Sequence, residues 1–144
     1  MNGSSIPVLE CLCASFRRAS RALTQHYDEA LRPLGLTPTQ FTILQALSIT
    51  GTIHQGKLGE ILAMDTTTLT RTLEIMARRG WVEKLPGSDR RERQLRLARP
   101  GFDQLNRALP VWQKVQSRLR RKLGGEPWQA LMTLTNKVTS AVTE

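Results

Sequence analysis

Apolar residues recur every three or four positions along most of this chain, the spacing that places side chains on one face of an α-helix. The first such stripe spans residues 9–30, with charged residues on the opposite face, and predicts a helix that ends near Gly35. A second helix is expected to begin directly afterwards. Thr37 can cap it, Pro38 suits its first turn, and Gln40 completes a capping box.

The central part of the chain predicts two short helices followed by two strands. The first helix covers residues 54–62, with Leu58, Ile61 and Leu62 facing inward, and the second begins after Asp65 and ends at Gly80. This second helix has an apolar face made of Leu69, Leu73 and Met76. Its polar face is expected to stay exposed and contains Thr67, Thr68, Thr70 and Arg71. Residues 81–85 and 93–97 alternate as strands around a loop at 86–92.

The chain ends in two further amphipathic helices. The first is long, contains Pro110, which is expected to kink it, and stops at Gly124. Pro127 is expected to open the last helix. Together with the first helix, these elements carry more apolar surface than the small central module can cover. We therefore expect a homodimer in which the terminal helices of two chains interleave.

This order of elements predicts a mainly α protein with a small β-wing. A helix suited to the DNA major groove, followed by an arginine-tipped hairpin suited to the neighbouring minor groove, is the arrangement of a winged helix-turn-helix. At 144 residues the chain is expected to form a single domain over 1–144. Within it, residues 36–98 are the expected DNA-binding lobe, and residues 8–34 and 100–143 are the expected dimerisation helices.

The charge of the chain supports a polyanionic partner. Its formal net charge is +9, and residues 71–107 alone contain ten lysines and arginines against five acids. No apolar run approaches the ~20 residues that cross a bilayer, and the N-terminus lacks a secretory signal, so a cytoplasmic protein without a membrane partner is expected. The sequence has no phosphate-binding glycine loop, nucleophile elbow or metal-ligand spacing. We therefore expect neither an enzyme nor a bound cofactor or metal.

Several residues of the expected winged helix are candidates for DNA contacts. Threonine hydroxyls reach phosphates or base edges, and Arg71 is suited either to bidentate guanine recognition or to a phosphate. Arginines at the wing suit the negative potential of the minor groove, and Asp89 is expected to orient one of them through an ion pair. The candidate DNA-binding residues are Thr66, Thr67, Thr68, Thr70, Arg71, Arg90, Arg91 and Arg93.

Residues 9–142 resemble the MarR family of bacterial transcriptional regulators. The segment DRRERQLRLARPG at 89–101 is similar to the wing motif of that family, although Ala98 stands where a threonine is usual. The segment MDTTTLTRTLEIMARRGWVEK at 64–84 resembles the recognition helix and its exit. The resemblance implies an obligate homodimer that binds a near-palindromic double-stranded DNA operator and usually represses transcription.

Two sensing mechanisms remain open. Residues 12–27 resemble the first helix of the branch that responds to organic hydroperoxides, which implies that Cys13 is a redox sensor supported by Tyr27. In this chain Arg17, Pro38 and Phe41 stand where that branch tends to have tyrosines.

The alternative effector is a small aromatic acid, bound in a pocket between the dimer helices and the DNA-binding lobe. The expected lining residues are His26, Phe41 and Trp112. A different class of function is also open, namely an architectural protein that binds DNA without sequence preference and without an effector.

Overall fold

The computed structural model describes residues 10–86 and 92–143. Within these residues the chain is mainly helical, as the sequence predicts, and it contains one three-stranded sheet. The elements are α1 (Leu12–Leu31), a 3₁₀ turn η1 (Arg32–Leu34), α2 (Pro38–Thr50), β1 (Ile53–His54), α3 (Gln55–Leu62), α4 (Thr66–Arg78), β2 (Val82–Lys84), β3 (Gln94–Leu97), α5 (Arg99–Leu123) and α6 (Gly125–Thr143).

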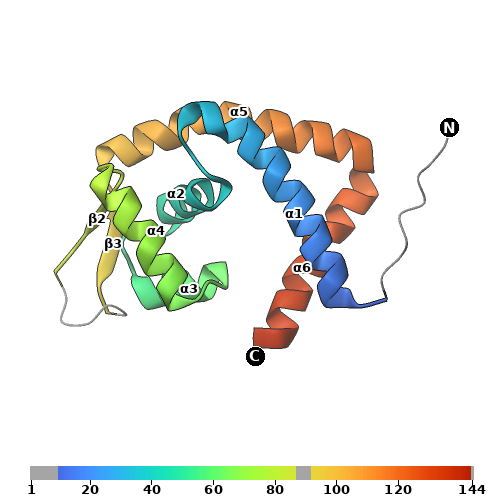
Figure 1. Cartoon of the computed structure of the whole chain (residues 1–144), viewed down its shortest axis with the longest axis horizontal. Helices are drawn as coiled ribbons and strands as arrows, with labels where there is room; N and C mark the ends of the chain where they lie inside the picture. The colour runs from blue at the N-terminus through green and yellow to red at the C-terminus, as the bar shows by residue number, and fades with distance from the viewer. Residues whose placement is uncertain (1–9, 87–91, 144) are drawn as a thin grey trace.

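The molecule has two parts (Figure 1). Helices α2, α3 and α4 gather with the sheet into a lobe at one end, while α1 and α6 lie at the other end, and α5 runs along both. The buried core lies in the lobe and at the end of α1 that meets it. It contains ten almost fully buried large side chains: Leu31, Leu36, Ile43, Leu44, Leu47, Leu58, Leu69, Leu73, Met76 and Leu95.

Helix α2 begins as its sequence predicts. The Thr37 hydroxyl accepts a hydrogen bond from the backbone N–H of Gln40 at 3.1 Å, and the Gln40 side chain accepts one from the backbone N–H of Thr37 at 3.0 Å. This reciprocal pair satisfies two donors that the first turn of a helix leaves free. The helix ends at Gly51, whose φ of +69° is favourable for glycine.

The sheet is antiparallel and has the order β1-β3-β2. Leu95 of β3 lies opposite both Ile53 of β1 and Lys84 of β2, and Leu97 lies opposite Val82. Leu95 and Leu97 are both buried, so one face of the hairpin packs on the helices. β2 is one residue shorter at each end than predicted, and β3 begins one residue later than predicted.

The loop after α1 is fastened to both α4 and α5. The Gln104 side chain donates to the carbonyl oxygen of Leu34 at 2.6 Å, and the Arg79 guanidinium donates to that of Gly35 at 2.8 Å. The same guanidinium lies 5.0 Å from the ring centroid of Trp81. These contacts hold the end of α4 against the junction between the lobe and the long helices.

Two sequence expectations need adjustment. Ile61 was expected to face inward, but its side chain is 50% exposed at the end of the short α3. Helix α6 begins at Gly125 rather than at Pro127. Pro110 lies inside α5 as expected, and the kink at this residue stays a prediction. Among the described residues, no helix combines the length and hydrophobicity that spanning a bilayer requires.

Candidate nucleic-acid interface

Asp65 determines where α4 begins. One of its carboxylate oxygens accepts a hydrogen bond from the backbone N–H of Thr68 at 2.8 Å, and the other accepts one from the Thr68 hydroxyl at 2.7 Å. These bonds to the charged form hold the pKa of the Asp65 carboxyl below its usual range. The turn before it contains Ala63 in the left-handed region, at φ +51°. The first turn of α4 is therefore fixed in place.

Helix α4 separates a buried face from an exposed one. Leu69, Leu73 and Met76 are buried, as predicted. Thr66, Thr67, Thr68 and Arg71 are exposed. The Thr68 hydroxyl is already engaged by Asp65, whereas the exposed row of Thr66, Thr67 and Arg71 presents hydroxyls and a guanidinium in the first two turns.

Thr70 does not belong to this exposed face, and the expectation that it is exposed is wrong. Its side chain is buried, and its hydroxyl accepts a hydrogen bond from the side-chain amide of Gln55 at 2.9 Å. Gln55 is itself only 3% exposed. The pair ties the first residue of α3 to the middle of α4. No local pattern in the sequence indicates this bond, because its partners are fifteen residues apart.

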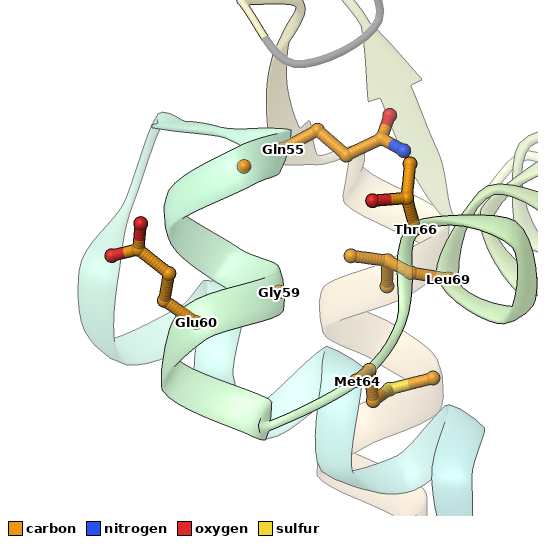
Figure 2. Close-up of a pocket in the computed structure, with 7 residues that line it drawn as sticks. Gln55, Gly59, Glu60, Met64, Thr66 and Leu69 are labelled. Atoms are coloured by element: carbon orange, nitrogen blue, oxygen red, sulfur yellow. The ribbon is translucent and has the colours of Figure 1, made fainter. Parts of the chain in front are cut away.

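A pocket of about 180 Å³ lies between α3 and α4 (Figure 2). Figure 2 shows Gln55, Thr66 and Leu69 on the side between the two helices, while Glu60 extends away from them. Gly59 faces Leu69 here, and an added Cβ would lie 3.4 Å from the Leu69 side chain. The full lining is Gln55, Gly56, Gly59, Glu60, Met64, Thr66 and Leu69.

The base of the wing is connected to the start of α3. The backbone N–H of Gln55 donates to the carbonyl oxygen of Arg93 at 2.9 Å, and Nδ1 of His54 lies 2.8 Å from the carbonyl oxygen of Glu92. Arg93 is half-buried. The other predicted wing residues, Asp89, Arg90 and Arg91, lie outside the described residues.

A charged pair crosses the two wing strands. Arg96 and Glu83 lie directly opposite each other, and the Arg96 Nε donates to a Glu83 carboxylate oxygen at 2.7 Å. Both side chains are about half exposed, so this pair fixes the hairpin register more than it stabilises the fold.

The three residues expected to line an effector pocket lie in different environments. Phe41 is 3% exposed and belongs to the core, with its ring centroid 5.8 Å from that of Trp112. His26 is exposed on α1 and packs edge-on against Tyr27 at 6.4 Å. None of the three lines the pocket between α3 and α4. A site for an aromatic acid built from them stays a prediction.

The candidate redox pair is separated within one chain. Cys13 is an exposed free thiol near the start of α1, as is Cys11. Tyr27 lies fourteen positions after Cys13 on the same helix, which is ~21 Å at 1.5 Å per residue. The Tyr27 hydroxyl donates to the side chain of Gln116 on α5, and partial burial raises the pKa of that hydroxyl. A contact between the two residues therefore requires a second chain.

Known proteins are similar to this chain in sequence and in fold. The family model described as the MarR family matches residues 36–92. SarZ, an HTH-type transcriptional regulator of Staphylococcus epidermidis, is 30% identical over 105 residues, which are 72% of this chain and 71% of SarZ.

This chain belongs to the MarR family.

Further similarities agree with that membership. The crystal structure of the M. tuberculosis transcriptional regulator MosR in complex with DNA is 37% identical, with a TM-score of 0.82, over 92% of this chain and 96% of that one. YwoH, an HTH-type transcriptional regulator of Bacillus subtilis, is 29% identical over 57% of this chain. The matched region spans 60% of the length of YwoH.

The last residues of the MarR-like wing motif form the start of α5. Ala98 occupies the N-cap of α5 without a side-chain cap, which agrees with the loss of the usual threonine. Gly101 lies so close to the preceding hairpin that an added Cβ would come within 2.1 Å of the Trp81 carbonyl oxygen. Glycine at this position therefore allows α5 to pack directly against the backbone of Trp81, which follows α4.

The terminal helices expose large apolar side chains in the single chain. Helix α6 buries none of its described residues, and α1 buries only Leu31. Exposed apolar residues on these helices and at the end of α5 are Leu12, Phe16, Leu23, Leu123, Leu131, Met132, Leu134 and Val142.

Proposed function

We propose that this MarR-family protein is a sequence-specific DNA-binding transcriptional regulator that represses from a near-palindromic operator. The observation that carries the proposal is the row of Thr66, Thr67 and Arg71 on the exposed face of α4, beside a wing base that contains Arg93. A helix of this kind fits the major groove of B-form DNA. The DNA complex of MosR supports this use of the fold.

Each candidate residue has a distinct role in this proposal. Arg71 recognises a guanine through two hydrogen bonds, and Thr66 and Thr67 contact phosphates or base edges. The wing arginines Arg90, Arg91 and Arg93 enter the minor groove, and Asp89 orients one of them. Thr68 contributes mainly by holding Asp65 at the helix start, and Thr70 supports α4 from inside the lobe.

The functional unit in this proposal is a homodimer. The exposed apolar side chains of α1, α5 and α6 would lie in water in a single chain, and association of two chains removes them from it. Two copies related by a two-fold axis present two α4 helices to successive major grooves, ~34 Å apart. A palindromic operator matches that symmetry.

In this proposal, one of two effectors releases the protein from DNA. A small aromatic acid bound near His26 and Trp112, or oxidation of the Cys13 thiol by a hydroperoxide, would favour a dimer with the wrong spacing between its α4 helices. Exposure of Cys13 makes its thiol accessible to an oxidant. We expect hydroperoxide to dissociate the Cys11→Ser control from DNA but not the Cys13→Ser variant. An aromatic acid would dissociate both variants from DNA.

Selection of preferred duplexes from a random DNA pool tests this function. The proposal expects two inverted half-sites about one helical turn apart and a complex that contains two protein chains per duplex. Recovery of unrelated sequences, with affinity determined by salt alone, would instead support an architectural DNA-binding protein.

A further inference from the structure

His54 is the N-cap residue of α3, but its side chain does not cap that helix. N-cap side chains normally accept a hydrogen bond from the backbone N–H two or three residues on. The His54 ring is turned instead toward the wing, where Nδ1 lies 2.8 Å from the carbonyl oxygen of Glu92. A carbonyl oxygen can only accept, so Nδ1 carries the hydrogen and donates it.

This bond extends the sheet beyond its last strand pair. His54 pairs with Gln94 at the end of the β1–β3 ladder. Glu92 lies two residues before Gln94 in the sequence, outside β3. The neighbouring backbone N–H of Gln55 donates to the Arg93 carbonyl oxygen at 2.9 Å. The peptide groups on both sides of Arg93 are therefore held by the His54–Gln55 pair.

Gln55 also contacts α4, the helix expected in the major groove. The Gln55 side chain, 3% exposed, donates to the Thr70 hydroxyl in the middle of α4. One dipeptide thus connects the wing base, the start of α3 and the helix expected in the major groove. A connection of this kind fixes the distance between two DNA-contacting elements, so that less conformational entropy is lost on binding.

We propose that His54 is a positioning residue for DNA recognition, which holds Arg93 at a fixed place relative to α4 through the Glu92 carbonyl group. This inference rests on the proposed function. It assigns to His54 a role that does not require contact with DNA. This role differs from simple stabilisation of the lobe, because the effect of His54 on DNA affinity must act through the side chain of Arg93.

Two substitutions separate the two roles. His54→Thr places a good cap on α3 but removes the ring that reaches Glu92, so the free energy of unfolding stays equal or rises while DNA affinity falls. His54→Asn carries an amide N–H close to the position of Nδ1 and is expected to keep affinity near that of the unsubstituted protein. Loss of one such bond corresponds to a fall in affinity of roughly threefold to tenfold.

The decisive experiment is a double-mutant cycle on the full chain, measured by fluorescence anisotropy with the duplex recovered from the random pool. We expect His54→Thr to weaken DNA binding when Arg93 is present. In the Arg93→Ala background, we expect His54→Thr to cause no further loss of affinity. Equal losses in both backgrounds, or no loss in either, would overturn the inference. Failure of the unsubstituted protein to prefer any duplex would instead overturn the proposed function.

Discussion

The side-chain amide of Gln55 donates a hydrogen bond to the hydroxyl of Thr70 across the helix-turn-helix, and both side chains are buried. A buried polar pair of this kind contributes modestly when intact, but it is costly when one partner is removed, because the remaining group keeps its desolvation cost. The bond therefore specifies how α3 sits on α4 rather than simply adding stability.

Replacing only one member of this pair should destabilise the protein. Thr70→Val keeps the shape of the side chain but leaves the Gln55 amide without an acceptor, so the free energy of unfolding should fall by roughly 1–3 kcal/mol. Replacing both, as Gln55→Met with Thr70→Val, should recover most of that loss. Urea unfolding of Thr70→Val, Gln55→Met and the double variant measures both effects, and an additive loss in the double variant would contradict this role for the bond.

The packing of α5 against Trp81 gives a second prediction. In Gly101→Ala the new methyl would lie 2.1 Å from a backbone oxygen, so the backbone must shift, and the free energy of unfolding should fall by roughly 1–3 kcal/mol. Gly125→Ala is the matched control, because nothing lies within 4 Å of its added methyl. Thermal unfolding should show a lower Tm for the first variant only. Equal Tm values for the two variants would show that α5 does not need this close approach.

The cap at the start of α4 predicts a dependence of stability on pH. Hydrogen bonds from Thr68 lower the pKa of Asp65 in the folded chain relative to its ordinary value. The stabilisation is therefore fully present above that ordinary value, about 3.9, and is lost as the pH falls through the lowered folded value.

Asp65→Asn keeps a capping side chain without a titrating group, and it serves as the control for this effect. Urea unfolding between pH 2 and pH 6, roughly the range in which aspartate titrates, should show a shallower acid dependence for Asp65→Asn than for the unsubstituted protein. Parallel curves would mean that the bonds from Thr68 do not favour the charged carboxylate.

Local patterns in the sequence predict much of the fold, because their partners are close along the chain. The capping box of Thr37 and Gln40 and the cap at Asp65 lie within one helical turn, and both are present. The apolar face of α4 follows the helical period and is buried as predicted. The family resemblance, carried by the wing and recognition-helix segments, is confirmed by the comparisons.

The sequence predictions fail where a partner lies far along the chain. Thr70 follows three exposed threonines, and only its distant partner Gln55 explains why it is buried. The role of His54 depends on Glu92, thirty-eight residues away, and no helical or strand period indicates it. Ile61 follows the apolar period of α3, yet it lies at the end of an eight-residue helix that the lobe covers incompletely.

The central claim, sequence-specific DNA binding through α4, is tested most directly by comparing two arginine variants on the selected duplex. Arg71→Ala removes the proposed guanine contact, whereas Arg118→Ala removes the same charge from α5, outside the DNA-binding lobe. By fluorescence anisotropy, Arg71→Ala should weaken binding at least about tenfold and relax the base preference of one position in each half-site, while Arg118→Ala changes affinity less than about twofold. Equal losses for the two variants, with the base preference unchanged, would contradict the account.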